Sequence, residues 1–85
     1  MKLFSLENKF IKETTSVPAG FTGIVEWDGG DKSWLQNGEW HRIDGPAYTG
    51  KDLNGRFEFY FIDDKKVTKE QHDLLVDIMK LKGLI

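Results

Sequence analysis

The sequence contains no cysteine and no long hydrophobic run. Without cysteine, neither disulfides nor thiolate metal sites can hold the fold together, which is consistent with a reducing compartment. Residues 1–6 include no apolar stretch of signal-peptide length, and no other stretch approaches the roughly 20 apolar residues that cross a membrane. We therefore expect a soluble cytoplasmic protein that has no membrane partner.

A large excess of one charge is also missing. Twelve basic and 14 acidic residues are mixed along the chain, and the net charge is −2. No basic block is longer than Lys65 and Lys66, so the electrostatic footprint of a nucleic-acid-binding protein is absent. The acidic excess is too small for a DNA mimic. We expect no nucleic-acid partner.

Aromatic residues, in contrast, are plentiful, with six Phe, three Trp and two Tyr among 85 residues. A chain of this length supports one domain and buries only about 60–65% of the surface that the unfolded chain exposes. The core must therefore be thin and filled by large side chains. We expect a single domain over residues 1–85.

Residues 32–47, with the sequence KSWLQNGEWHRIDGPA, carry the clearest structural signal. Asn37 and Gly38 are typical of a two-residue type I′ hairpin turn, which needs a positive φ at both positions. This turn places Leu35 opposite Trp40 on one face of the sheet, and we expect that face to meet the core. A second turn follows, in which Asp44 can accept a hydrogen bond from a backbone N–H.

Alternating apolar residues predict further strands. We expect an N-terminal strand or hairpin over residues 1–15, a loop over 16–21 and an antiparallel β-meander over 22–67. Within the meander, residues 48–55 are predicted to be a polar loop after a brief extended piece. Residues 56–62 carry apolar groups on both faces, which is typical of a central strand covered on two sides.

The hydrophobic period changes near the end of the chain. Thr68 and Gln71 form a capping box, and apolar residues then recur at helical spacing, so we predict a helix over residues 69–82. Gly83 is placed for a left-handed helix cap. The predicted fold class is α+β: an antiparallel β-meander of about five strands with one C-terminal helix packed on a face of the sheet, burying about five side chains.

A faint internal repeat runs through the chain. A shift of 26 residues aligns residues 34–39 with residues 60–65, so that an aromatic residue, a two-residue turn and a charged return recur in the same order. The later copy lacks the His-Arg pair that follows the first turn. Two copies are too few for a solenoid, which favours a meander of hairpins.

Residues 34–47 resemble the W-x-x-N-G-x-x-H-R-x-D-G-P-A repeat of small proteins encoded by bacteriophages and some bacteria. The resemblance extends over residues 24–82 and does not include the N-terminal segment. It implies a small β-rich protein from a group that mostly has no assigned activity. The resemblance also implies a role for some of these proteins in the takeover of a host by a phage, and with it a host protein as the partner.

Six residues are candidates for a binding surface for a protein partner or ligand. They are Trp34, Trp40, His41, Arg42, Asp44 and Tyr48. Arg42 could hold a phosphate or carboxylate, with His41 beside it as an acid or base. Alternatively, Arg42 and Asp44 share a face of an extended chain and pair with each other while Asp44 holds the turn. The sequence leaves both interpretations open.

The tryptophans allow two interpretations as well. Trp27, Trp34 and Trp40 can form a platform on which a sugar or a base stacks, or they can fill the core. The small size of the domain favours the core for at least two of them.

No pattern of catalytic residues is found. His41 and His72 are the only histidines, and their separation does not match a metal-binding motif. There is no cysteine nucleophile, and no serine lies within a hydrolase motif. We therefore predict no catalytic residues, no metal site and no cofactor.

The favoured function is a small non-enzymatic protein-binding module, which we expect to be a phage-encoded protein that binds and interferes with a host factor in the bacterial cytoplasm. A free sheet edge can add a strand from a partner, and it also permits a homodimer. The alternative is a small-ligand protein that binds a nucleotide or sugar through Arg42, His41 and the tryptophans.

Overall fold

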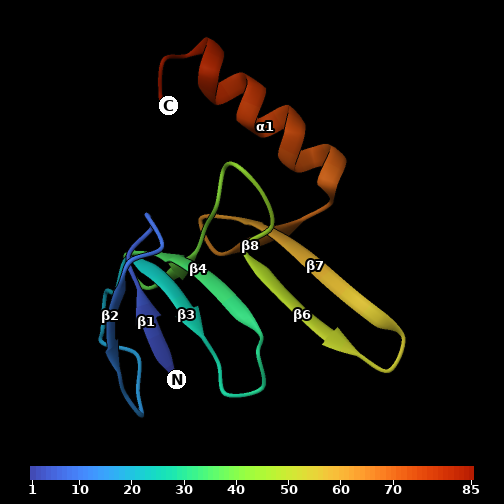
Figure 1. Cartoon of the computed structure of the whole chain (residues 1–85). Helices are drawn as coiled ribbons and strands as arrows, with labels where there is room; N and C mark the ends of the chain where they lie inside the picture. Colours follow the sequence, from blue (N-terminus) through green and yellow to red (C-terminus); the bar gives the residue numbers. More distant parts are fainter.

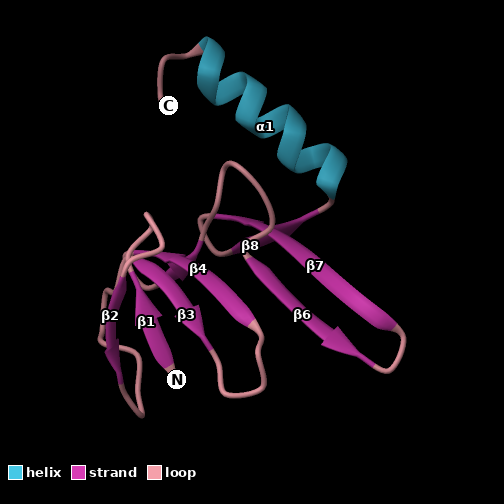
Figure 2. Cartoon of the chain, in the orientation of Figure 1, coloured by secondary structure: helices cyan, strands magenta, loops and turns pink.

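The computed structural model describes residues 1–85 and shows one antiparallel sheet followed by a single helix (Figure 1). The α+β class is confirmed, although the sheet holds eight strands, more than predicted. The strands lie in the order β2-β1-β3-β4-β6-β7-β8 (Figure 2). The short β5 pairs with β4. In chain order the elements are β1 (Lys2–Phe4), β2 (Phe10–Glu13), β3 (Gly23–Glu26), β4 (Lys32–Gln36), β5 (Glu39–Trp40), β6 (Tyr48–Asp52), β7 (Gly55–Ile62), β8 (Lys65–Val67) and α1 (Lys69–Leu81).

The hairpin between β4 and β5 forms with the predicted register. Asn37 and Gly38 have φ values of 52° and 82°. The later turn of the internal repeat is also left-handed at both positions, with φ values of 48° at Asp63 and 69° at Asp64. Because Asn, Asp and Gly tolerate this conformation better than other residues, the turn residues decide where the chain reverses.

Residues 48–55 are not the predicted polar loop. Tyr48–Asp52 form β6, which pairs along its whole length with β7. Gly50 lies inside this strand, where a Cβ atom would be 2.5 Å from Asp31 Oδ1 and 2.5 Å from Phe57 Cζ. The glycine that makes the segment look like a loop is therefore needed for close approach of neighbouring side chains.

The sheet buries small clusters on both faces. We call the face that carries Val25 and Leu35 the front face, and the face that carries Ile24 the back face, because side chains alternate along a strand. On the front face, Leu3 packs with Val25 and Leu35. On the back face, Ile24 and Ile62 are buried. Only ten of the 85 residues are buried, so the core is as thin as predicted.

Helix α1 begins as predicted and ends one residue early, at Leu81. The Thr68 side chain accepts a hydrogen bond from the Gln71 N–H, and the Gln71 side chain accepts one from the Thr68 N–H. After the helix, Gly83 has a φ of 71°, and the N–H of the next residue donates to the Met79 carbonyl. These local hydrogen bonds satisfy backbone N–H and C=O groups that have no partner within the helix. For this reason the residue types alone predicted where the helix begins and ends.

The predicted packing of the helix is only partly right. α1 stands beyond one end of the sheet and does not lie across a face (Figure 1). Its main contact with the strands is with β7, and only His72 and Val76 are buried. Leu74 and Leu81, two of the apolar residues that recur at helical spacing and were predicted to pack on the sheet, are largely exposed. Apolar residues therefore occupy two sides of the helix, and one of these sides faces away from the domain.

Candidate functional site

The six predicted binding residues divide between the two faces of the sheet. Trp40 lies opposite Leu35, and Tyr48 lies opposite Ser33, so both belong to the front face. Trp34 lies between Ser33 and Leu35 in β4 and therefore belongs to the back face. The structure thus contains two candidate surfaces, each with part of the predicted set.

On the back face, Arg42 is held by three contacts. Its Nε donates to Asp44 Oδ1 at 2.9 Å, and its Nη1 donates to the Pro46 carbonyl at 3.1 Å. Its Cζ lies 4.1 Å from the centre of the Trp34 ring, a cation–π contact. These contacts match the interpretation in which Arg42 and Asp44 pair locally, and they leave only Nη2 of the guanidinium without a hydrogen bond.

The hydrogen bond from Arg42 lowers the pKa of Asp44 below its ordinary value of 3.8, against the opposing effect of partial burial. The Asp44 side chain is 79% exposed, so we expect Asp44→Asn to destabilise the fold at neutral pH by only about 0.2–1 kcal/mol. The pKa of Asp44 is lower in the folded state than in the unfolded chain. The stabilisation by the Asp44 carboxylate is therefore complete above pH 3.8 and is lost as the pH falls through the folded-state pKa. Urea unfolding should therefore separate the two proteins at neutral pH and not at strongly acidic pH. A difference that persists in acid would contradict this origin.

The two turns of the internal repeat lie against each other. The Asp63 N–H donates to His41 Nδ1 at 3.1 Å. Beside it, the Asp64 N–H donates to the Trp40 carbonyl at 2.8 Å, and Asp64 Oδ1 accepts from the Trp40 N–H at 3.1 Å. The Nδ1 atom of His41 is therefore used in a structural contact, and only its Nε2 atom remains for a ligand.

His72 was not among the predicted site residues, yet it connects the helix to this region. The residue is 2% exposed, and its Nε2 donates to the Arg42 carbonyl at 2.6 Å. The imidazole also packs on the Tyr60 ring, with ring centres 5.0 Å apart. His72 lies four residues before the buried Val76, so the helical period carried a signal for its inward position.

A groove of about 780 Å³ opens on the back face between this region and the end of α1. It exists because the helix stands away from the sheet and leaves the space beneath its last residues unfilled. Lys32 adds a positive charge to the groove, and Met79 adds apolar surface. Four of the six predicted residues line it: Trp34, His41, Arg42 and Asp44. The volume lies within the range of about 300–1,000 Å³ that is typical of small-molecule sites.

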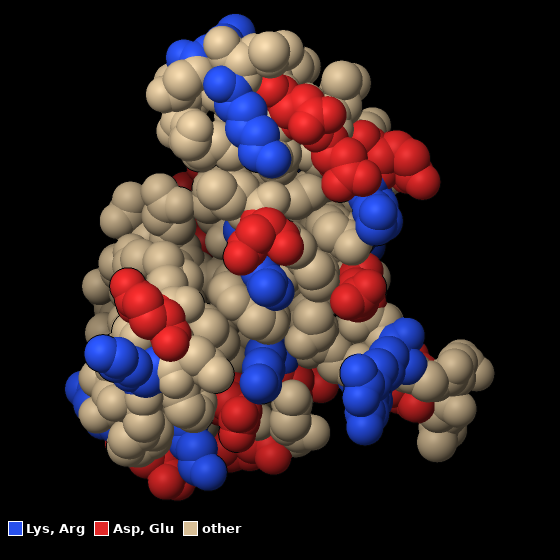
Figure 3. Space-filling model, turned by 45° about the horizontal axis from the view of Figure 1, so that its top comes forward, with Lys and Arg blue, Asp and Glu red and all other residues tan.

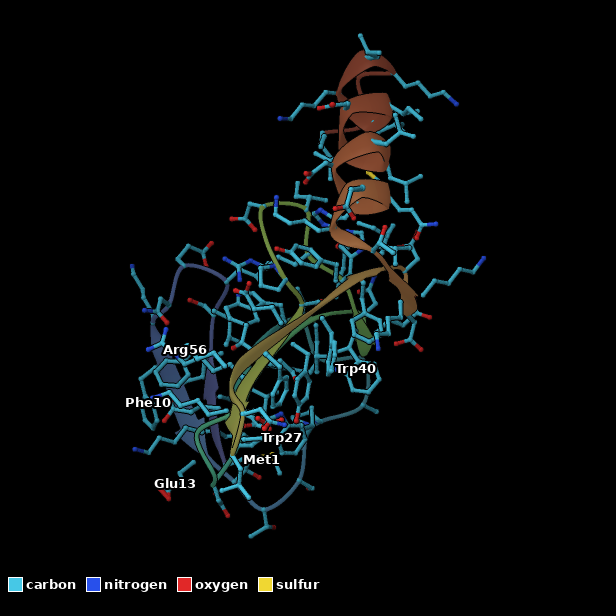
Figure 4. All side chains as sticks on the ribbon, turned by 90° about the vertical axis from the view of Figure 1, so that its right-hand side faces the viewer. Met1, Phe10, Glu13, Trp27, Trp40 and Arg56 are labelled. Atoms are coloured by element: carbon cyan, nitrogen blue, oxygen red, sulfur yellow. The ribbon has the colours of Figure 1, made fainter.

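On the front face, five aromatic side chains form a cluster that we call the aromatic strip. They are Trp40, Tyr48, Phe57, Phe59 and Phe61. The ring centres of Trp40 and Phe61 are 5.1 Å apart, and those of Phe57 and Phe59 are 5.2 Å apart. In the edge-on view of Figure 4, Trp40 lies on the opposite side of the ribbon from Arg56.

Hydrogen bonds hold the strip in place. The fully buried Ser33 Oγ accepts from Trp27 Nε1 at 2.9 Å and from Trp40 Nε1 at 3.3 Å. The Tyr48 hydroxyl donates to Asp31 Oδ2 at 2.8 Å. Burial, together with this hydrogen bond, raises the pKa of Tyr48 above its ordinary value of 10.0, so the hydroxyl keeps its proton and its bond throughout the neutral range.

The strip is only partly covered. Trp40 and Phe59 are each 36% exposed, and Lys66 Nζ lies 4.1 Å from the centre of the Phe59 ring. The alternation over residues 56–62 was predicted. The expectation that this strand is covered on both faces is wrong, because its front face is partly exposed. The expectation that at least two tryptophans fill the core is met only in part, because none of the three is fully buried and only Trp27 packs, partly buried, against the cluster of Leu3, Val25 and Leu35.

The fold and these surfaces define a small α+β protein whose open antiparallel sheet is aromatic on one face and grooved on the other. Helix α1 is neither long nor apolar enough to cross a membrane. No group of three or more His, Asp or Glu residues forms a possible metal site. Comparison with protein-family models, with curated proteins and with solved structures finds no match. The function is therefore inferred from the residues of this chain.

Proposed function

We propose that this chain is a small non-enzymatic protein-binding module that takes up a segment of a partner protein on its aromatic strip. The observation that carries the proposal is the clustering of five incompletely buried aromatic side chains on the front face. Aromatic residues are enriched at the centres of protein interfaces, where they bury large areas with few rotatable bonds. Exposed apolar clusters of this kind mark interaction sites.

The geometry of the strip favours a protein partner over a sugar or a base. The rings of Tyr48 and Phe57 stack with an interplanar angle of 11°, and Trp40 meets Tyr48 at 79°. Neighbouring rings thus occupy much of the flat surface on which a sugar or base would stack. Apolar edges remain, with the Lys66 ammonium at their border. Such a surface suits apolar side chains followed by an acidic residue beside Lys66.

The resemblance of residues 34–47 to phage-encoded repeat proteins directs the search for the partner to bacterial proteins. In this proposal the chain acts in the cytoplasm of a bacterial host, where it binds and interferes with a host protein. Arg42 and Asp44 hold the turn beside Trp40. The motif residues therefore support the binding surface, and the strip makes the contacts.

The proposal predicts that binding depends on the front face of β7. Phe59→Ser should weaken retention of the partner about tenfold or more, because truncation of a central interface aromatic typically has this effect. Glu58→Ser changes the adjacent residue on the back face and is the matched control. The measurement is quantitative mass spectrometry of bacterial lysate proteins retained by the wild-type chain and both variants, after circular dichroism has shown that all three fold. Equal retention by all three overturns the proposal.

A second candidate function is binding of a nucleotide or sugar in the groove, and the observation that favours it is the lining by Trp34, His41 and Arg42. Of these three side chains, Trp34 Nε1, His41 Nε2 and Arg42 Nη2 make no hydrogen bond within the chain. Calorimetric titration with a panel of nucleotides and sugars tests this function. A heat of binding that His41→Ala abolishes supports it, and no heat with any member of the panel excludes it for those ligands.

A further inference from the structure

We propose that Asn54 is a site of spontaneous deamidation in the folded chain and that tertiary contacts protect Asn37 from the same reaction. Two of the three asparagines, Asn37 and Asn54, are followed by glycine. Asparagine is thermolabile because the backbone nitrogen of the next residue can attack its side-chain amide, and glycine has no side chain to hinder the attack. Both pairs lie in exposed hairpin turns, so the sequence alone does not distinguish them.

The reaction is intramolecular and consumes only water. The Gly55 nitrogen forms a bond to the side-chain carbonyl carbon of Asn54, and the side-chain nitrogen leaves as ammonia after taking up the proton of the Gly55 amide. Water then opens the resulting succinimide ring at either carbonyl. The product is aspartate or isoaspartate, and in isoaspartate the main chain runs through the former side chain. Either product replaces a neutral group with a carboxylate.

The turn at Asn37 is bound to another part of the chain. The Asn37 N–H donates to Thr22 Oγ1 at 2.9 Å, and the Gly38 N–H donates to the Phe21 carbonyl at 2.9 Å. Phe21 itself packs, partly buried, against the buried cluster of the front face. The Gly38 nitrogen loses its proton when it attacks, so its hydrogen bond to Phe21 must break first. The neighbouring bond to Thr22 holds the main chain against rotation.

The turn at Asn54, between β6 and β7, has no such anchor. Only its own hairpin holds it, because the Asn54 N–H donates to Asp52 Oδ1 at 2.8 Å and Gly55 pairs with Asp52 in the ladder. Leu53 is fully exposed, and a Cβ atom on Gly55 would meet nothing within 4 Å. In Figure 3 this turn projects from the lower right of the molecule, and its outermost part carries no charged group.

The two turns therefore differ in the free energy needed to open them. Opening of a hairpin tip costs little, whereas opening that also breaks tertiary contacts costs more. Asn54 should react at nearly the rate of the unfolded chain, and Asn37 only during rare openings. As isoaspartate, position 54 adds a carbon to the main chain immediately before β7. This inference rests on neither the aromatic strip nor the groove, and it can fail independently of the functions proposed for them.

Peptide mapping of the full chain by mass spectrometry tests the proposal. The chain is incubated at mildly alkaline pH, folded in buffer and unfolded in guanidinium chloride, and the deamidation rate is measured at each site. Folding should slow the reaction at Asn37 about tenfold or more and at Asn54 by no more than about threefold. Because each site is compared with itself, the different residues that flank the two Asn-Gly pairs do not affect the result.

Two variants serve as matched controls, after circular dichroism has shown that both fold. Thr22→Val removes the hydroxyl that accepts from Asn37 and should speed deamidation at Asn37 by about two- to tenfold, with no change at Asn54. Asn54→Gln should lose the main acidic species that ion-exchange chromatography separates from aged protein, since glutamine reacts far more slowly. The proposal is overturned if folding slows both sites equally, if Asn54 does not react in the folded chain, or if Thr22→Val leaves Asn37 as slow as before.

Discussion

Replacing His72 with alanine is expected to lower the free energy of unfolding by about 2–4 kcal/mol and the melting temperature by roughly 10–20 °C. The imidazole is almost fully buried, and its Nε2 donates to the Arg42 carbonyl at 2.6 Å. The substitution removes packing against Tyr60 and leaves a partly buried carbonyl without a partner. Because this contact joins the helix to the rest of the domain, α1 should separate from the sheet before the sheet unfolds.

Leu74→Ala provides the matched control for this prediction. It truncates a side chain of the same helix that is largely exposed, so the free energy of unfolding should change by no more than about 0.5 kcal/mol. Thermal unfolding followed by circular dichroism measures both variants, and amide hydrogen exchange reports on Lys69–Leu81 separately. If both variants are equally stable and equally protected, His72 does not anchor the helix.

Gly23→Ala is expected to destabilise the domain by about 3 kcal/mol or more. Gly23 has a φ of 151°, a conformation that residues with a side chain rarely adopt. A Cβ atom there would lie 2.4 Å from the Phe4 carbonyl oxygen and 2.6 Å from the Phe21 ring. The oxygen belongs to the backbone of β1, which pairs with β3, so it cannot move away without breaking the ladder beside Val25.

Gly29→Ala separates this effect from a general intolerance of alanine. Gly29 lies in the turn after β3, and a Cβ atom there would meet nothing within 4 Å. Its free energy of unfolding should therefore change by no more than about 0.5 kcal/mol. Urea unfolding of the two variants and the wild-type chain measures the contrast. A Gly23→Ala variant as stable as Gly29→Ala would show that β1 and β3 do not pair as closely as described.

Features that depend on neighbouring residues were predictable. The Asn37–Gly38 turn, the register of its hairpin and the capping box at Thr68 are set by conformational preferences that span only a few residues. The Arg42–Asp44 contact belongs to the same class, because the two residues lie only two apart in the sequence. In the alternative interpretation, Arg42 holds the phosphate or carboxylate of a ligand. The sequence could not decide between the two because it does not show whether such a ligand exists.

Features that depend on distant parts of the chain were not predictable. The segment Tyr48–Asp52 has the composition of a loop and is a strand because β7 pairs with it. Once it is a strand, Tyr48 shares the front face with Phe57 and Phe59, and the aromatic strip follows. Trp34 and Trp40 lie on opposite faces because of the register of the β4–β5 hairpin, and with Tyr48 on the front face the predicted set of site residues forms two surfaces.

By itself the sequence determined the α+β class, the two tight turns and the ends of the helix, because φ preferences and capping hydrogen bonds are local properties of residues. Only the tertiary structure decided where the helix stands, which aromatic rings stay uncovered and which side chains share a groove. These outcomes depend on how elements far apart in the chain compete to cover one another. In a chain of 85 residues, one short helix does not have enough surface to cover the whole sheet.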